Sequence, residues 1–375
     1  MINHSIDKKS AKITLLRPEH QRKFFKFLSS IDSNSLNTYT RWGYKIQPKI
    51  ISKQIMDEII NGKEIAWICT INNLIVGYQH INFIPNSRKN IVRDGTIVLK
   101  KHTGHGFGQL LKNECIKFVK KNNFIKITAI VYEKNLSSLI NNLNCGFLIS
   151  GIFFNEEKIN GISRYAVSME IPISKKIHQK YFIEKIHYFK KIKYSELKIK
   201  QKNNFENNSI PTFLQKMNKS KIIINSKVQK IFIKKLNKKS KIVFIKDSFH
   251  IETFGIIEMF SNPNKKHVAR IHIFSKIKSL KNYYTILSEI IRLGGKLKLE
   301  KIWINVLENN SELIKVLISS KFQIESIAFQ HKMSNSVAID ILSFAYYFDN
   351  PAVFDVEKTI KTLLPLKNKI RFTMH

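Results

Sequence analysis

Residues 97–111 read IVLKKHTGHGFGQLL, and this stretch decides how the rest of the chain is interpreted. Three glycines, Gly104, Gly106 and Gly108, stand at alternate positions in a chain that has only 13 glycines among 375 residues. An apolar run precedes them, and apolar residues at helical spacing follow them. Glycine permits close backbone approach and unusual dihedral angles. A strand, a glycine turn and a helix N-terminus in this order therefore predict a cradle for an anion.

Two common nucleotide motifs do not fit this stretch. A P-loop requires Gly-Lys-Ser/Thr where the helix begins, but Gly108 is followed by Gln109 and Leu110. The dinucleotide fingerprint has the spacing G-x-G-x-x-G, whereas the spacing here is G-x-G-x-G. Both nucleotide-binding classes are therefore excluded.

A second stretch, TAIVYEKNLSSLINNLNCGF at 128–147, completes a family pattern. Together the two stretches resemble the GNAT superfamily of acyl-CoA-dependent N-acyltransferases. The pyrophosphate loop of that family is written Q/R-x-x-G-x-G/A, and residues 103–108 match it except at the first position, where Thr103 stands. The downstream N-x-x-A…G-F signature is met by Asn135, Ser138, Gly146 and Phe147.

The resemblance implies acetyl-CoA as co-substrate and an amine as acceptor. It places the acyl group and the pantetheine arm along a strand, and the pyrophosphate on the amides of the glycine loop. The residues that it assigns to acetyl-CoA are Ile97, Val98, Leu99, Thr103, Gly104, His105, Gly106, Phe107, Gly108 and Asn135.

The resemblance also suggests where a catalytic base would lie. Asp94, on the strand before the loop, is the first candidate, because family members often carry a carboxylate near there. The alternative is that Asp94 forms an ion pair with Arg93 or Arg88 at the end of the strand. Glu133, at the end of the neighbouring strand, is a second candidate for the base.

The resemblance supplies no acid to protonate the leaving thiolate. Many family members carry a tyrosine seven residues after the signature asparagine, and this chain has Asn142 there, which cannot act as a general acid. His102 and His105 have H-x-x-H spacing but no third ligand nearby, so no metal site is expected. Trp42 and Tyr44 lie where this family usually shapes its acceptor site, and packing of a loop onto the core explains them equally well.

Periodicity predicts an α/β (α+β) fold in the first half of the chain. The expected strands are 11–16, 64–71, 74–84, 91–99, 125–132, 147–154 and 164–171. The expected helices are 18–31, 48–61, 108–123 and 135–144. Asn72-Asn73 between two strands is a hairpin signal.

The second half carries the same order of elements at a constant numbering offset, so that position 126 corresponds to position 301. The matched strands are 66–72 with 241–247, 77–85 with 252–260, 94–99 with 269–274, and 126–135 with 301–310. This offset predicts two tandem GNAT-like units, each a mixed, mainly antiparallel central sheet flanked by helices. The expected domains are 1–175, 190–350 as a degenerate copy, and a C-terminal extension at 351–375. Opposite the glycine loop the second copy has 278–283, KSLKNY, without glycine.

The composition of the chain limits the compartment and the partners that are expected. The three cysteines are scattered, and neither a signal peptide nor an apolar run long enough to cross a membrane occurs. A soluble cytoplasmic protein without a membrane partner is therefore expected. The net charge is +37, and residues 176–246 hold 20 lysines against 3 acids, which would suit a nucleic-acid partner. A solvated, lysine-rich linker explains this segment as well.

The function expected from the sequence is N-acetyl transfer from acetyl-CoA to a primary amine, either an amino sugar, a small amine or a protein amine. A non-catalytic acyl-CoA sensor and a nucleic-acid-associated protein remain as alternatives. The first would bind acetyl-CoA without turnover. The second would bind nucleic acid with an affinity that falls steeply with salt.

Overall fold

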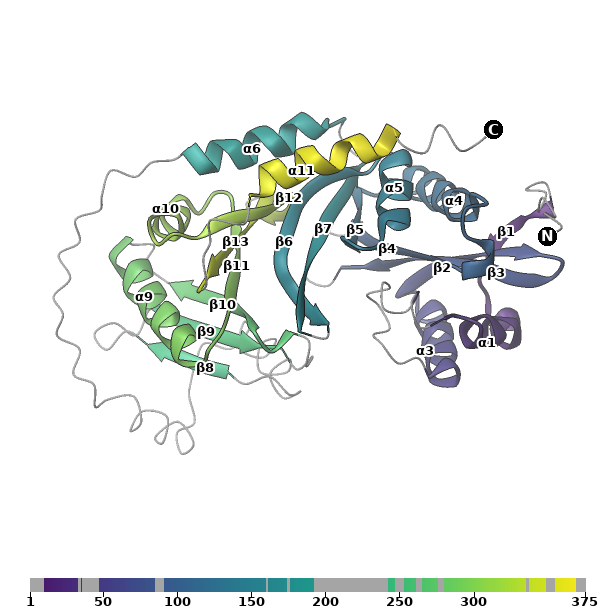
Figure 1. The fold of residues 1–375 in the computed structure, drawn as a ribbon, viewed down its shortest axis with the longest axis horizontal. Helices are drawn as coiled ribbons and strands as arrows, with labels where there is room; N and C mark the ends of the chain where they lie inside the picture. The colour runs from purple at the N-terminus through teal and green to yellow at the C-terminus, as the bar shows by residue number, and fades with distance from the viewer. Residues whose placement is uncertain are drawn as a thin grey trace.

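The computed structural model describes residues 10–32, 35, 47–84, 91–159, 161–173, 176–191, 242–246, 253–260, 265–275, 280–334, 337–348 and 355–368. Its centre is one 13-stranded sheet in the order β1-β2-β3-β4-β5-β7-β6-β12-β13-β11-β10-β9-β8 (Figure 1). The strands are β1 Lys12–Leu15, β2 Glu64–Ile71, β3 Leu74–Phe83, β4 Ile91–Val98, β5 Lys126–Tyr132, β6 Leu148–Ile159, β7 Ile162–Pro172, β8 Ile242–Lys246, β9 Thr253–Met259, β10 Val268–Ser275, β11 Lys301–Leu307, β12 Gln323–Ser334 and β13 Val337–Tyr347. The α-helices are α1 Gln21–Ser29, α3 Pro48–Ile60, α4 Phe107–Lys121, α5 Leu136–Asn144, α6 Gln179–Lys191, α9 Leu280–Lys296, α10 Ser311–Ser319 and α11 Val356–Leu363.

The expected fold class is confirmed. Among the described strands only β4–β5 and β10–β11 pair in parallel, and the other pairs are antiparallel. Asn72 and Asn73 have φ angles of 48° and 63°, the left-handed conformation that a tight hairpin turn needs. The helix expected at 18–31 begins with a short 3₁₀ turn, Pro18–His20, before α1. Proline fixes the first φ angle there, and the imidazole of His20 accepts the backbone N–H of Arg17 at 3.1 Å.

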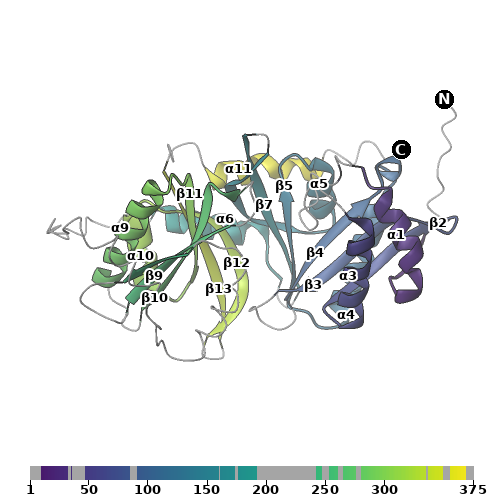
Figure 2. The same cartoon turned by 90° about the horizontal axis from the view of Figure 1, so that it is seen from below.

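Helices cover the two faces of the first half of the sheet differently. α4 and α5 lie on one face, and α1 and α3 lie on the other (Figures 1 and 2). The main core, under α4 and α5, includes Phe107, Leu111 and Val131. A smaller core, under α1 and α3, includes Phe24 and Tyr78. Side chains of β4 alternate between these two cores, as the pleat of a strand requires.

β4 and β5 run side by side for only three residues. Ile91–Arg93 pair with Lys126–Thr128, and beyond them the two strands separate although both continue. β10 and β11 separate in the same way after Arg270 and Trp303. Strands that separate leave backbone N–H and C=O groups facing a gap, where a ligand can take up their hydrogen bonds.

The second half repeats bounds of the first at the expected offset. β11, α10, β12 and β13 begin and end at positions numbered 175 higher than those of β5, α5, β6 and β7. The register shifts of the β6–β7 hairpin, at Ile149/Gly151 and Phe153/Glu157, recur at Ile324/Ser326 and Ala328/Lys332. These bounds support the duplication, which stays a prediction.

The offset does not hold in β10. Sheet pairing places Arg93 beside Thr128 and Arg270 beside Trp303. Thr128 and Trp303 differ by 175 in numbering, but Arg93 and Arg270 differ by 177. The expected match of 94–99 with 269–274 is therefore wrong by two residues. The segment from Arg270 to Trp303 is thus two residues shorter than the segment from Arg93 to Thr128.

The two halves join where β6 meets β12. Ser326 pairs with Gly151, and these two positions also correspond to each other at the constant offset. A Cβ atom at Gly151 would lie 2.3 Å from the carbonyl oxygen of Glu325 and 2.3 Å from Cα of Ser326. Only glycine permits this approach, because both obstacles are backbone atoms.

Two buried ion pairs secure the same junction. The carboxylate of Glu170 accepts from Lys126 at 2.7 Å and from the backbone N–H of Phe329 at 3.2 Å. The carboxylate of Glu325 accepts from Lys301 at 2.9 Å and from the backbone N–H of Phe154 at 3.0 Å. Phe154 and Phe329 are corresponding positions as well. Each half thus donates a backbone N–H to a carboxylate of the other, and the sheet is continuous through the junction.

A Gly151→Ala variant is expected to lose about 3 kcal/mol of stability, since overpacking against backbone cannot relax by side-chain rotation. The measurement is thermal and urea unfolding of the full chain. Gly295→Ala in α9 is the matched control, because a Cβ there would meet its nearest neighbour at 3.8 Å. The control should keep or slightly raise stability, since alanine favours a helix more than glycine does. Equal losses in the two variants would contradict the tight junction.

The described part of the connection between the halves includes a helix. α6 lies in the expected linker region, and the side chain of Gln179 bonds both the N–H and the C=O of Ile149 at 2.7 Å. α11, from the C-terminal extension, lies beside α6 across the junction strands (Figure 1). Most of the lysine-rich segment, 192–241, lies outside the described residues. Within the described residues, no helix is both long enough and apolar enough to cross a membrane.

Candidate functional site

The glycine stretch forms the turn that the sequence predicts. After β4 the chain makes a 3₁₀ turn at Lys100–His102, and α4 begins at Phe107. Gly104 and Gly106 have φ angles of 84° and 81°, which other residues rarely adopt. No hydrogen bond within the described part of the chain engages the N–H groups of residues 104–109. These amides, together with the positive end of the α4 dipole, form an anion cradle.

The side chains of the loop support this cradle rather than fill it. The hydroxyl of Thr103 donates to the carbonyl of Lys100 at 2.7 Å, so it is occupied locally. Phe107 is buried at the start of α4, and the ring of His105 stacks on it with centroids 6.0 Å apart. Nδ1 of His102 is buried without a partner, and burial lowers the pKa of this histidine. The neutral imidazole adds no charge to the cradle.

The strand side of the site lies at the open end of the sheet. Ile97 and Leu99 point their side chains into the small core under α1 and α3, whereas Val98 packs against the main core. β4 pairs with β3 through Val98, and beyond Arg93 its opposite edge faces the gap left by β5. The backbone of residues 97–99 can therefore offer hydrogen bonds to a ligand lying in that gap.

Asp94 is not paired as expected. It is buried, and one carboxylate oxygen accepts from Nζ of Lys112 on α4. The same oxygen accepts from Nε2 of Gln79 at 3.3 Å. The ion pair is thus neither with Arg93, which points to the opposite face, nor with Arg88, which lies outside the described residues. This carboxylate is already engaged by a buried lysine, and breaking that pair to bind another group would leave the lysine charge without a partner.

Lys112 is the residue that the sequence did not single out. It is 2% exposed and stands between the core residues Leu111 and Cys115. The available signal was a lysine at an apolar position of an amphipathic helix, where a buried charge needs a partner.

The second half has apolar side chains at the positions that correspond to the Asp94–Lys112 ion pair. The counterparts of Asp94 and Lys112 are Ile271 and Leu287, both in the main core. The scaffold therefore does not require the ion pair. Buried ion pairs are often replaceable by apolar residues of similar volume, whereas loss of one partner is costly.

A Lys112→Leu variant is expected to lose about 3–5 kcal/mol, because it leaves the Asp94 carboxylate buried and unpaired. The double variant Asp94→Ile with Lys112→Leu should recover most of this loss. Urea unfolding of the wild type, of Asp94→Ile, of Lys112→Leu and of the double variant measures the coupling free energy between the two side chains. An additive double variant would show that the two side chains do not act as a pair.

Glu133 lies in a different environment. It follows the end of β5, at the edge of the sheet where β4 runs into the glycine loop. One of its carboxylate oxygens is buried and has no hydrogen-bond partner. Burial raises the pKa of Glu133 above its ordinary value, against the weaker opposite effects of a backbone hydrogen bond and of the charge of Arg164. A half-buried carboxylate with a raised pKa and an oxygen without a partner suits the role of a proton acceptor, and no buried lysine among the described residues is bonded to it.

Asn135 and Asn142 both belong to α5. The side chain of Asn135 caps this helix by accepting the backbone N–H of Ser138 at 3.2 Å, and Asn310 caps α10 in the same way. Asn142 is 2% exposed, and its Nδ2 donates to the sulfur of Met169 at 3.7 Å. Its amide oxygen is buried without a partner and can accept a hydrogen bond, but the group has no proton to transfer.

The described residues opposite the loop in the second half differ from it. α9 already begins at Leu280, opposite His105, while Lys278 and Ser279 lie outside the described residues. Tyr283 stands opposite Gly108 and is buried, and its hydroxyl accepts from Asn310 at 3.5 Å. A tyrosine ring occupies the position where the first half has only a glycine hydrogen. Residues 280–283, opposite 105–108, are thus helical and contain no glycine.

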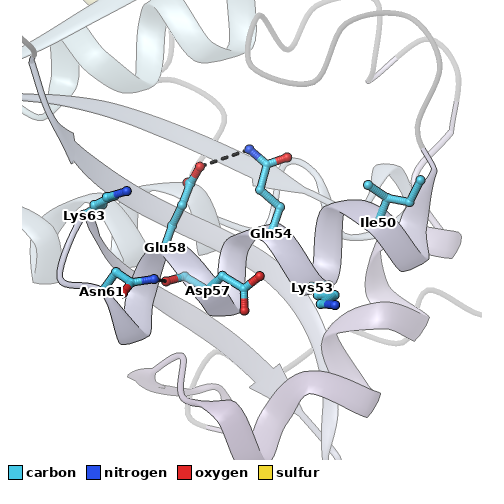
Figure 3. A pocket seen from close by; sticks show the side chains of 7 residues that line it. All are labelled: Ile50, Lys53, Gln54, Asp57, Glu58, Asn61 and Lys63. Carbon is cyan, nitrogen blue, oxygen red and sulfur yellow. Dashed lines mark hydrogen bonds between the residues drawn. The ribbon is translucent and has the colours of Figure 1, made fainter.

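The other candidate sites are a surface groove, possible metal ligands and two aromatic residues, and none of them extends the site at the glycine loop. A surface groove of about 340 Å³ runs along α3, lined by Ile50, Lys53, Gln54, Asp57, Glu58, Asn61 and Lys63 (Figure 3). All of these residues come from α3 and the turn after it, so the groove brings no distant groups together. The described residues hold no cluster of three His, Cys, Asp or Glu side chains that could bind a metal. Trp42 and Tyr44 lie outside the described residues.

Comparison with known proteins agrees with this geometry. Residues 33–147 match the model of the acetyltransferase (GNAT) family, and the chain therefore contains a GNAT acetyltransferase domain of the acyltransferase class. Comparison with curated proteins found no match.

Similar solved structures cover about the same part of the chain. An acetyltransferase of the GNAT family from Streptococcus pneumoniae is 19% identical, with a TM-score of 0.38, over 44% of this chain and 99% of that one. A spermidine N-acetyltransferase from Vibrio cholerae, in complex with CoA and spermine, is 19% identical, with a TM-score of 0.39, over 45% and 98%. A ribosomal-protein-S5-alanine acetyltransferase from Vibrio fischeri is 14% identical, with a TM-score of 0.40, over 46% and 98%. At these TM-scores the likeness says nothing about the acceptor of this chain.

Proposed function

We propose that the protein transfers an acetyl group from acetyl-CoA to a primary amine, and that the transfer occurs at the open end of β4 and β5. The observation that carries this proposal is the loop at 104–108, with two left-handed glycines and free amides at the start of α4. The pyrophosphate of acetyl-CoA would lie on these amides. The pantetheine arm and the acyl carbonyl would bond the backbone of residues 97–99 in the gap.

The chemistry needs a base for the attacking amine. Each of the two carboxylates considered from the sequence has one buried oxygen without a partner, but Asp94 is bound to Lys112, so we assign the role to Glu133. In this scheme Glu133 removes a proton from the amine as it attacks the acetyl carbonyl. The carbonyl oxygen becomes negative and is stabilised by strand N–H groups in the gap. The C–S bond then breaks, and the CoA thiolate takes a proton from water, since Asn142 cannot supply one.

The second half of the chain is, in this proposal, a degenerate copy of the same unit that no longer binds acyl-CoA. The element bounds that recur at the constant offset support the duplication. Tyr283 and the early start of α9 support the loss of the cradle. The remaining role of this half is to complete the sheet and to contribute side chains at the junction.

The test is titration of acetyl-CoA into the full chain by calorimetry, followed by thiol release from acetyl-CoA in the presence of amines. One site per chain and acceptor-dependent thiol release are the expected results. Binding without thiol release for amino sugars, small amines and peptide amines would favour the acyl-CoA sensor instead. Absence of binding would contradict both and leave the nucleic-acid alternative.

A further inference from the structure

Arg93 and Arg270 occupy corresponding places in the two halves. Each is the last residue of the short parallel pairing between two strands, Arg93 beside Thr128 and Arg270 beside Trp303. Their neighbours Asp94 and Ile271 point to the face covered by α4 and α9. Successive side chains of a strand alternate, so both arginines point to the opposite face of the sheet.

The side chain of Arg270 is held in place by a ring contact, but one of its hydrogen-bond donors has no partner. Its guanidinium lies over the ring of Trp303, at 4.3 Å from the centroid. The carboxylate of Glu258 is 3.9 Å away, which is too far for a hydrogen bond. Nε of Arg270 and Nε1 of Trp303 are both buried without a hydrogen-bond partner. Two unpaired donors beside each other are what an anionic group such as a carboxylate or a phosphate would satisfy.

The side chain of Arg93 lies within range of the positive charge of Arg270. It makes no hydrogen bond or ion pair within the described part of the chain. Arg93 is exposed at the surface, but desolvation by neighbouring protein groups, followed by the positive charge of Arg270, lowers its pKa. Two guanidinium groups from distant strands thus approach each other although like charges repel.

The carboxylates nearby are engaged by other cations. Glu156 pairs with Lys265 across the junction. Glu300 pairs with Lys158, also across the junction. Glu258 accepts from His272 at 2.9 Å, closer than its approach to Arg270. This leaves the arginines without a directly bonded carboxylate among the described residues.

The position of Arg93 relative to the proposed acetyl site indicates how an acceptor could reach it. Arg93 and Ile97 point to the same face of β4 and are four residues apart, which is about 13 Å along a strand. An acceptor whose amine reaches the acetyl group beside Ile97 can therefore extend along β4 towards Arg93.

We propose that Arg93, Arg270 and Trp303, the arginine patch, bind a carboxylate or phosphate group of the acceptor, so that the substrate is an amine with an anionic group up to about 13 Å from its nitrogen. The proposal rests on the proposed acetyl transfer. It also gives the second half a role, because two of the three residues come from it.

The first experiment measures anion binding without turnover. Inorganic phosphate is titrated into the full chain while tryptophan fluorescence is followed, and Trp303→Phe identifies the signal. We expect saturable quenching that is at least tenfold weaker in Arg270→Gln, because hydrogen bonds to charged groups are worth about one to two orders of magnitude in affinity. Arg292→Gln is the matched control, since Arg292 pairs with Glu289 on α9. No saturable binding, or equal loss in the control, would overturn the proposal.

The second experiment compares acceptors. Amino acids with the amine at increasing distance from the carboxylate are tested beside alkylamines of equal length, in the wild type, Arg93→Gln and Arg270→Gln. We expect KM for the best anionic acceptor to rise about tenfold or more, with little change for alkylamines. Equal changes for both kinds of acceptor would overturn the proposal.

Acetyl-CoA titrations separate the remaining outcomes. Unchanged acetyl-CoA affinity in Arg270→Gln is expected. Weakened affinity would assign the patch to a phosphate of the donor and overturn the acceptor proposal. If wild-type protein binds acetyl-CoA but acetylates no amine, the proposed function fails by itself, and phosphate binding still decides whether the patch is an anion site.

Discussion

A Glu133→Gln variant is expected to lose about 10²–10⁴-fold in kcat, the usual contribution of a positioned general base. Glutamine keeps the size and polarity of the side chain but cannot accept the proton of the attacking amine. The acetyl-CoA affinity should stay unchanged, because Glu133 does not belong to the glycine loop. Steady-state kinetics and calorimetry on the same preparations measure the two effects.

The pH dependence gives a second readout of the same residue. Burial raises the pKa of Glu133 above its ordinary 4.5, and a base must be ionised to act. The value of kcat/KM should therefore fall as the pH decreases through this raised pKa, and the variant should lose this acidic limb. Asp94→Asn is the comparison. If Asp94→Asn removed the limb and Glu133→Gln kept it, the assignment of the base would be reversed.

A Gly106→Glu variant is expected to abolish acetyl-CoA binding. Gly106 is the residue before α4 and has a φ angle of 81°, so a side chain there is strained and brings bulk and negative charge to the cradle. Repulsion between a carboxylate and the pyrophosphate adds to the steric effect. Calorimetric titration should show no heat of binding, whereas the wild type shows one site per chain.

Gly62→Glu separates strain from ligand repulsion. Gly62 also has a positive φ angle, 63°, and an added Cβ there meets no atom within 4 Å. It lies in the turn after α3, away from the loop. This variant should bear the same backbone strain and still bind acetyl-CoA. Retained binding in Gly106→Glu would show that the loop is not the donor site.

Local signals in the sequence predicted most of the first half. The Asn72-Asn73 turn, the glycine loop and the helical spacing of α4 depend on residues close in the chain, and all three appear as expected. The Asp94–Lys112 pair could not be predicted in this way. It joins a strand to a later helix, and nearby arginines offered equally good partners from the sequence alone.

The register of β10 shows another limit of prediction from the sequence. The match of 94–99 with 269–274 followed hydrophobic letters, and a strand keeps its apolar alternation when it slips by two residues. Hydrogen-bond pairing with β11 revealed the slip, and that information lies in a distant strand. The arginine patch was missed for the same reason, since Arg93 and Arg270 correspond only after the slip is corrected.

The pairing of Gly151 with Ser326 has a consequence for how such a chain can change. In a symmetric dimer of identical subunits, every substitution appears twice, so neither side can lose a function that the other must keep. Here the two partners of the strand pairing are separate positions of one polypeptide. One side can therefore lose its loop while the other retains it. Gly151 and Ser326 are an example of such a difference between the two sides. The glycine on one strand leaves room for the serine on the other.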